Sequence, residues 1–143
     1  MGRRNSLKPD IMKTSYFAFC LMILFVLFSC KKKEEKSDVQ LVTVEETKAV
    51  MDSGEDIYLL DVRTPEEFEE EHLFQAINIP VTDDDFKDRL EGLDKNKPVY
   101  IYCKSGNRSA RAGKILSEMG FEHVYDVEGG ITKWREAEEG IVH

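Results

Sequence analysis

Short apolar runs alternate with polar, helix-like segments from about residue 39 to the end of the chain. The run at 57–62 is apolar apart from Asp61, which is the pattern of a strand buried on both faces of a sheet. Because helical segments separate the runs, successive strands are expected to lie parallel, with helices on both faces. The pattern therefore predicts an α/β fold with a five-stranded, mainly parallel sheet. Its strands are expected at 39–42, 57–62, 76–79, 98–102 and 123–127.

Helix start and stop signals lie between these runs. Thr43-Val44-Glu45-Glu46 and Thr64-Pro65-Glu66-Glu67 both have capping-box spacing, and the second also has proline at the first helical position. The acidic turn after Thr82 favours a further helix start, and Gly120 favours a helix end. Helices are therefore expected from 43 to about 51, from 64 to about 71, from 82 towards 90, from 108 to 119, and around Trp134.

The first 29 residues have the pattern of an export signal rather than of folded protein. A basic start is followed by an uncharged, mostly apolar stretch at 14–29, which falls short of the roughly 20 residues of a typical membrane span. Leu27-Phe28-Ser29-Cys30 resembles a bacterial lipobox, which implies cleavage before Cys30 and lipid attachment to that cysteine. The sequence thus divides into a signal peptide at 1–29, a charged tether at 30–38 and a folded domain at 39–143. This organisation predicts a membrane-anchored lipoprotein of the bacterial cell envelope that faces the periplasm or the exterior.

Two alternatives stay open for this segment. It could remain uncleaved as a signal anchor, which would tether the domain on the same side of the membrane without lipid on Cys30. Met12 could also be the true start, because Met12-Lys13 would open a lipoprotein signal of ordinary form.

The charge balance excludes one class of partner. The whole chain has a net charge of −8, and the part after residue 36 has 12 basic against 25 acidic residues. Such a surface repels a phosphate backbone, so we expect no nucleic-acid partner. About 100 folded residues suffice for one hydrophobic core and leave no room for a second domain.

Cys103 is the only cysteine expected in the folded part, because Cys20 lies in the apolar signal stretch and Cys30 is the predicted lipidation site. It follows the apolar run 99–102 and precedes a helical pattern, so the sequence places it in a strand-to-helix loop. The N–H groups of such a loop and the helix N-terminus both stabilise negative charge, which favours a thiolate nucleophile. An inert, buried core cysteine is the alternative.

The residues after Cys103 fit an anion-binding loop. Gly106 permits a backbone conformation in which successive N–H groups point inward. Ser105 and Ser109 add hydroxyl donors, and Arg108 could offer a forked pair of donors to an oxyanion. A small anionic substrate is therefore expected.

Charge and spacing narrow the chemistry further. Between residues 95 and 117 the chain has six basic residues and no acidic one, which predicts a local positive patch over the pocket. Four residues separate Cys103 from Arg108, one fewer than in cysteine phosphatases. The smaller loop suits a single sulfur on the cysteine better than a phosphoryl group, although phosphatase or arsenate-reductase chemistry remains an alternative.

Four motifs resemble those of the rhodanese family of single-domain sulfurtransferases. They are Asp61-Val62-Arg63-Thr64-Pro65-Glu66-Glu67-Phe68, His72 with Ala76-Ile77-Asn78-Ile79-Pro80, Cys103-Lys104-Ser105-Gly106-Asn107-Arg108-Ser109, and Glu128-Gly129-Gly130 with Trp134. The resemblance runs from about residue 39 to 142 and implies a rhodanese-like fold in which Cys103 carries a persulfide. It also implies that the substrate is bound by Lys104, Ser105, Gly106, Asn107, Arg108, Ser109 and Arg63, with Asp61 in a supporting role.

The resemblance implies a sulfurtransferase. Cys103 would take a sulfur from a small anionic donor such as thiosulfate and pass it to a thiol or cyanide acceptor. A persulfide carrier or sulfur-relay binding module without turnover is the alternative. No metal or organic cofactor is expected, because no cluster of candidate ligands has metal-binding spacing. His72 is interpreted as a structural hydrogen bonder and Trp134 as a core residue.

Overall fold

The computed structural model describes residues 38–137 and 140–143, together with Gly2. Apart from Gly2, the predicted signal peptide lies outside the described residues, as do Cys30 and all of the predicted tether except Asp38. None of the helices in the described part is long and apolar enough to cross a membrane.

A five-stranded sheet with the order β1-β6-β5-β2-β4 forms the centre of the fold, and every neighbouring pair in it is parallel. This confirms the predicted α/β architecture. The strands are β1 (Gln40–Val42), β6 (Val124–Val127), β5 (Val99–Tyr102), β2 (Tyr58–Asp61) and β4 (Ile77–Asn78). Because parallel strands end at the same edge, the loops after β2, β5 and β6 gather there.

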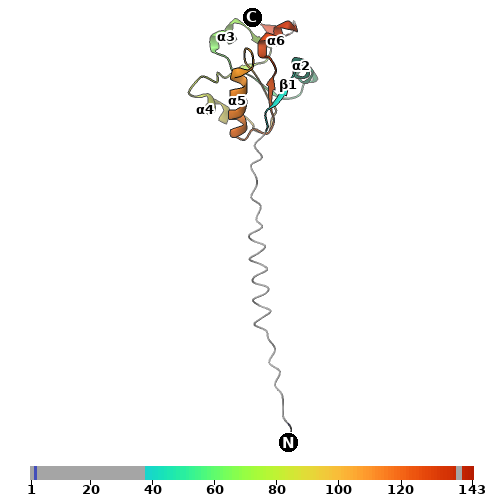
Figure 1. Cartoon of the computed structure of the whole chain (residues 1–143), viewed down its shortest axis with the longest axis vertical. Helices are drawn as coiled ribbons and strands as arrows, with labels where there is room; N and C mark the ends of the chain where they lie inside the picture. Colours follow the sequence, from blue (N-terminus) through green and yellow to red (C-terminus); the bar gives the residue numbers. More distant parts are fainter. Residues whose placement is uncertain (1, 3–37, 138–139) are drawn as a thin grey trace. The chain divides into compact units, whose positions relative to one another are not determined.

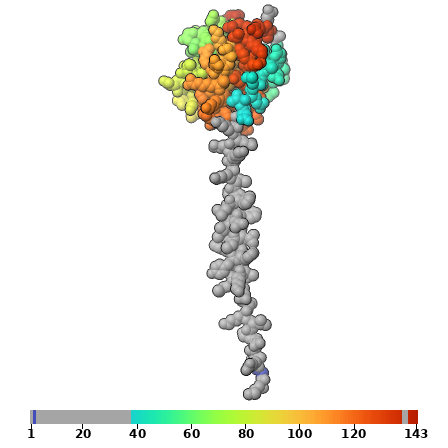
Figure 2. All heavy atoms as spheres, viewed as in Figure 1, coloured from blue at the N-terminus to red at the C-terminus, as the bar shows by residue number. Residues whose placement is uncertain are grey.

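Helices cover both faces of the sheet (Figure 1). One face packs against α4 (Phe86–Glu91) and α5 (Asn107–Glu118), and the other against α2 (Val44–Ser53) and α6 (Gly130–Glu136). In the space-filling view the atoms of α5 lie between the segment of α4 and the segment of β1 and α2 (Figure 2). The short helix α3 (Pro65–Glu70) follows β2 directly.

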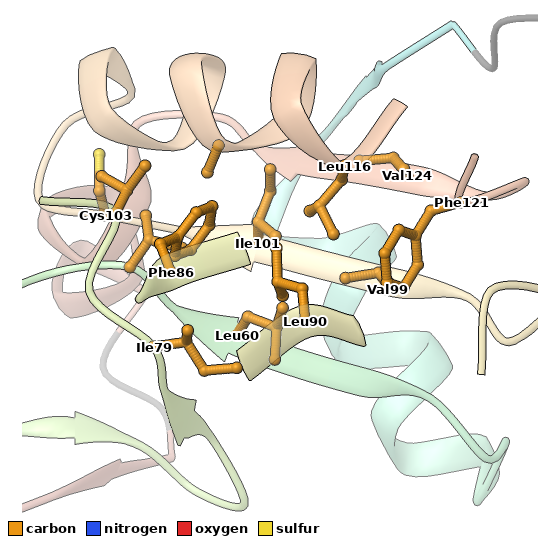
Figure 3. Packing of buried hydrophobic residues seen from close by; sticks show 13 residues of the cluster. Leu60, Ile79, Phe86, Leu90, Val99, Ile101, Cys103, Leu116, Phe121 and Val124 are labelled. Atoms are coloured by element: carbon orange, nitrogen blue, oxygen red, sulfur yellow. The ribbon is translucent and has the colours of Figure 1, made fainter. Parts of the chain in front are cut away.

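The larger core cluster lies between the sheet and α5 (Figure 3). Leu60 and Ile101, from neighbouring strands, pack with Phe86 of α4 and Leu116 of α5. Cys103 lies at one end of this cluster, so its side chain packs against apolar core atoms while its backbone begins the loop (Figure 3).

The second cluster fills the opposite face. It contains Tyr102, Ile131 and Trp134, and the Tyr102 hydroxyl accepts a hydrogen bond from Leu73 N at 3.1 Å. Trp134 is buried there, which confirms its interpretation as a core residue. Cys103 follows Tyr102 directly, so cores on both faces of the sheet fix the end of β5.

Both predicted capping boxes are present. Thr43 accepts from Glu46 N and Thr64 accepts from Glu67 N, while each glutamate side chain accepts from the N–H of its threonine. The prediction that a helix begins at Thr82 was wrong. Helix α4 begins at Phe86, and Asp85 makes no side-chain capping bond. Successive turns occupy the residues after Pro80, and the helix begins where Phe86 can be buried.

Two short strands were not predicted from the sequence. β3 (His72–Leu73) and β7 (Ile141–Val142) pair antiparallel in a separate small sheet. Two residues are too few to produce a periodic pattern, and their pairing depends on a contact across most of the domain.

Replacing Leu116 by alanine should destabilise the fold by about 2–5 kcal/mol, because its fully buried side chain would leave a cavity beneath α5. Leu41→Ala is the matched control, since Leu41 is 66% exposed and its loss should cost less than about 1 kcal/mol. Urea denaturation of both variants measures the free energies of unfolding. Equal losses would contradict the assigned core.

Candidate functional site

Cys103 lies immediately after β5, where the backbone turns towards α5. Gly106 has a φ of 113°, which an L-residue rarely adopts, and its N–H donates to Cys103 Sγ at 3.1 Å. The cysteine is 1% exposed, so it lies at the floor of the loop rather than on its rim. The structure therefore combines the two sequence interpretations: Cys103 is buried, and it also accepts a backbone hydrogen bond.

Ser109 lies on the first turn of α5 and is fully buried. Its hydroxyl lies 3.5 Å from Cys103 Sγ and donates to the Gly106 carbonyl at 3.0 Å. Burial acts to raise the pKa of the Cys103 thiol, but hydrogen bonds from the Ser109 side chain and the backbone of Ser109, Gly106 and Ser105 outweigh it and lower the pKa. The loop thus favours the thiolate, the form that acts as a nucleophile.

The N-terminus of α6 fixes the direction of the loop. Ile131 N donates to the Cys103 carbonyl at 2.9 Å, and Thr132 donates to the Lys104 carbonyl through its N–H at 3.2 Å and its hydroxyl at 2.8 Å. Because these carbonyls are directed to α6, the next N–H groups are free to face the sulfur. The sequence predicted only a turn at Gly129-Gly130 and missed this role.

Gly130 is the residue that permits this contact. It has a φ of 57°, and a Cβ added there would lie 2.3 Å from the Cys103 carbonyl oxygen. The signal in the sequence was a glycine pair directly before a helix, which local reasoning interprets as a turn.

Asp61 and Arg63 form a buried ion pair at the end of β2. Arg63 Nε lies 3.0 Å from both carboxylate oxygens of Asp61, and Nη2 donates to Asp61 Oδ2 at 2.7 Å and to the Glu71 carbonyl at 2.6 Å. Arg63 is 2% exposed. In this geometry the guanidinium of Arg63 is enclosed by protein acceptors. Substrate binding by Arg63 and a supporting role for Asp61 stay predictions.

Asn78, at the end of β4, supports the same turn. Its side-chain N–H groups donate to the carbonyls of Asp61 and Arg63, both at 3.0 Å. Asn78 belongs to the motif at 76–80 that resembles the rhodanese family, but no local pattern in the sequence predicts this contact.

Arg108 is already paired. Its guanidinium makes two bonds to Glu67 of α3, Nη1 to Oε2 at 2.5 Å and Nη2 to Oε1 at 2.9 Å. The Arg108 partner lowers the pKa of Glu67 to about 2, so this carboxylate stays ionised at any ordinary pH. In this structure the fork of Arg108 is thus occupied by Glu67, and its binding to an oxyanion stays a prediction. The two residues are 41 apart in sequence, which no local pattern reveals.

The predicted basic patch is divided between two ends of the sheet. Lys95 bonds to the Met119 carbonyl at the end of α5, and Lys97 pairs with Asp56 before β2. Both therefore lie at the amino ends of the strands, away from Cys103. Lys104, Ser105 and Asn107 are exposed at the cysteine loop itself, and their binding to substrate stays a prediction.

His72 is structural in this fold. Its Nδ1 lies 2.9 Å from the Phe68 carbonyl, and its ring stacks on Phe68 with centroids 3.9 Å apart. A cavity of about 300 Å³ between the end of α2 and the start of β2 contains none of the predicted site residues. Within residues 38–137 and 140–143, no group of three or more histidine, cysteine, aspartate or glutamate residues could hold a metal ion.

Gly130→Ala should disturb the cysteine loop, because the added Cβ would collide with the Cys103 carbonyl. We expect Cys103 alkylation by iodoacetamide at neutral pH to slow by about tenfold, the effect of one unit in pKa. Peptide mass spectrometry scores Cys103 separately from the other cysteines. Gly54→Ala is the matched control, since Gly54 also has positive φ but has open space around its Cβ position. Equal alkylation rates in the two variants would refute the role of Gly130.

Residues 43–137 match the family described as Rhodanese-like domain. Thiosulfate sulfurtransferase PspE of Escherichia coli is 44% identical over 72 residues, which cover 49% of this chain and 67% of PspE. Two Bacillus subtilis proteins are also similar: the uncharacterised YqhL, 42% identical over 76 residues, and YrkF, whose name proposes a sulfur carrier, 34% identical over 101 residues.

The matched regions cover 53% and 71% of this chain but only 59% of YqhL and 54% of YrkF, so the chain spans little more than half the length of these relatives. Among solved structures, a rhodanese-related protein from Thermoplasma volcanium aligns with a TM-score of 0.63 and 31% identity, covering 72% of this chain and 97% of that one. A rhodanese-like domain protein from Staphylococcus aureus aligns with a TM-score of 0.61 and 33% identity over 67% of this chain and 91% of its own. The chain belongs to the rhodanese-like domain family.

Proposed function

We propose that this protein is a sulfurtransferase that moves a sulfane sulfur from a donor such as thiosulfate to a thiol or cyanide through a persulfide on Cys103. The observation that carries the proposal is the contact between Gly106 N–H and Cys103 Sγ at 3.1 Å, within a loop that lowers the pKa of the thiol. Relatives named as thiosulfate sulfurtransferases support the same class of reaction.

In the first step the Cys103 thiolate attacks the outer sulfur of thiosulfate. A sulfur–sulfur bond forms on Cys103 while the sulfur–sulfur bond of thiosulfate breaks, and sulfite leaves with the bonding electron pair. The product is a Cys103 persulfide with its negative charge on the outer sulfur. Inward N–H groups and the exposed Lys104 would stabilise this charge.

In the second step the acceptor attacks the outer sulfur. Cyanide becomes thiocyanate, or a thiolate becomes a persulfide, and Cys103 leaves as a thiolate. The low pKa that favours attack in the first step also makes Cys103 a good leaving group in the second. Cys103 is the one cysteine in the described part of the chain. Within that part no second thiol could take the sulfur, so the acceptor must be an external molecule.

A carrier function is the second candidate, and the engaged arginines favour it. Arg63 and Arg108 are both held by carboxylates, so neither offers an unpaired guanidinium to an anionic donor. Such a site would bind thiosulfate weakly and could receive sulfur from a partner persulfide instead. The similarity to YrkF is consistent with a carrier function.

We also propose the domain organisation and location that the sequence suggests. Residues 1–29 would be a lipoprotein signal, cleavage would leave a lipid on Cys30, and residues 30–38 would tether the domain at 39–143 outside the cytoplasm. The basic start, the apolar stretch and the lipobox-like sequence support this proposal. An intact mass of the mature protein, equal to that of the uncleaved chain, would oppose it.

Cys103→Ser should abolish the release of sulfite from thiosulfate in the presence of cyanide, because serine forms no persulfide. Wild-type protein treated with thiosulfate should gain about 32 Da on the peptide that contains Cys103, one sulfur on the nucleophile, and the variant should gain nothing. Circular dichroism confirms that the variant is folded. Full activity in Cys103→Ser would overturn the proposal, whereas a stable adduct with almost no turnover would favour the carrier function.

Glu67→Gln should improve the use of thiosulfate by releasing Arg108 towards the anion. We expect KM for thiosulfate to fall by about threefold to tenfold with little change in kcat, the effect of one additional charged hydrogen bond. Glutamine preserves the capping box of α3. Glu66→Gln is the matched control, because it removes the same charge from the neighbouring residue, which is exposed, whereas Arg108 is paired with Glu67.

Steady-state assays at fixed ionic strength measure both variants. An equal change in KM for the two would attribute the effect to net charge alone and contradict a specific role of the pair between Glu67 and Arg108.

A further inference from the structure

Asp126 is a buried acid next to the cysteine loop, and the proposed reaction does not use it. It lies in β6 and is 6% exposed, and its Oδ1 has no hydrogen-bond partner among the described residues. A buried carboxylate oxygen without a partner is costly when the group is ionised, whereas protonation of the carboxyl reduces that cost. The state of this group therefore needs a physical explanation.

The register of the sheet brings Asp126 to the side of Ser109. Asp126 pairs with Ile101, two residues before Cys103, and Ile101 packs in the cluster beneath α5. Side chains of paired residues share one face of a sheet, so Asp126 also faces α5. Burial raises the pKa of Asp126, and its interaction with the Ser109 side chain lowers that pKa only in part. Ser109 in turn contacts Cys103 Sγ.

We infer that Asp126 is a positioning residue, protonated when Cys103 is a thiolate, whose O–H donates to Ser109 Oγ and so directs the Ser109 hydroxyl proton to the sulfur. This inference rests on the proposed use of Cys103 as a nucleophile. The proton stays on Asp126 throughout, so no group is oxidised or transferred. Ionised Asp126 would instead attract the Ser109 proton and place a second negative charge near the thiolate.

The charged and titratable residues of the neighbouring elements are few in the described part of the chain. On α5 the nearest charged residues to Ser109 are Arg108, which is paired with Glu67, and Arg111, which is exposed. Strand β1, whose Leu41 pairs with Asp126, has no titratable residue, and neither has β5 on the face of Ile101. In the described part of the chain, Ser109 is the residue whose side chain interacts with Asp126, and Cys103 is reached through Ser109.

The test compares two uncharged replacements of Asp126. D126N supplies an N–H that can donate to Ser109, whereas D126V is uncharged, smaller and offers no donor. The apparent pKa of Cys103 is measured in the full-length protein from the pH dependence of iodoacetamide alkylation, with the Cys103 peptide resolved by mass spectrometry from Cys20 and Cys30. If only the loss of charge matters, the two variants behave alike.

We expect the pKa of Cys103 to be at least about half a unit lower in D126N than in D126V, which is about threefold faster alkylation below that pKa. Wild-type protein should follow D126N at low pH and rise more slowly at higher pH, as Asp126 ionises. In a Ser109→Ala background the difference between D126N and D126V should disappear, because the hydroxyl that transmits it is gone. Coincident profiles in the presence of Ser109 would overturn the inference.

A measurement on the unmodified protein covers the case in which a variant does not fold. Carbon-13 NMR of the Asp126 carboxyl should show it protonated at pH values where an ordinary aspartate is ionised. Titration at the ordinary value would equally overturn the inference. Alkylation requires no sulfur donor, so a failure of sulfur transfer would refute the proposed function and leave these measurements interpretable.

Discussion

The direction of the peptide units around Cys103 is the constraint on which the rest of the site depends. A carbonyl that faced the sulfur would repel a thiolate, whereas an N–H stabilises it. In this fold the Cys103 and Lys104 carbonyls accept hydrogen bonds from the start of α6, while the Gly106 N–H donates to Cys103 Sγ. This places α6 in direct contact with the loop, which is possible only because Gly130 has no side chain. Residues from two distant segments thus act as a single unit, and the chemistry of Cys103 cannot be separated from the packing of the last helix.

Three arginines of the domain are each paired with a carboxylate. Asp61 holds Arg63, Glu67 holds Arg108 and Glu71 holds Arg135. The field that favours the thiolate therefore comes mainly from backbone N–H groups and the Ser109 hydroxyl, which are local and neutral. Such donors stabilise charge on the sulfur without attracting every anion in solution, because a neutral dipole loses its effect over a few ångströms. The site is accordingly better built to hold sulfur on Cys103 than to concentrate an anionic donor from a distance.

Local sequence patterns predicted the parts of this structure that local physics determines. The capping boxes at Thr43 and Thr64, the buried strands and the position of Cys103 between β5 and α5 follow from spacing over a few residues. Contacts across the fold were not accessible in this way: the pair of Glu67 with Arg108, the contact of Gly130 with the Cys103 carbonyl, and the sheet of β3 and β7. The predicted basic patch did not hold for two of its six residues for a related reason, because residues on either side of a strand lie at opposite ends of it. Lys95 and Lys97 are near Cys103 in sequence and distant from it in the sheet.

Because the site is buried, the position of the single Ser109 hydroxyl proton determines which neighbouring acceptor is stabilised. The Ser109 hydroxyl has one proton and faces the Gly106 carbonyl, Cys103 Sγ and Asp126. In a solvated site water would satisfy whichever acceptors the hydroxyl left, but Ser109 is fully buried and Cys103 nearly so. Each acceptor left without a donor then bears its own desolvation cost, which is largest for a charged one. Two adjacent negative charges would bear that cost twice and repel each other as well, so a core of this kind favours one charge at a time. In the proposed arrangement that charge belongs to the sulfur because the acid beside it keeps its proton.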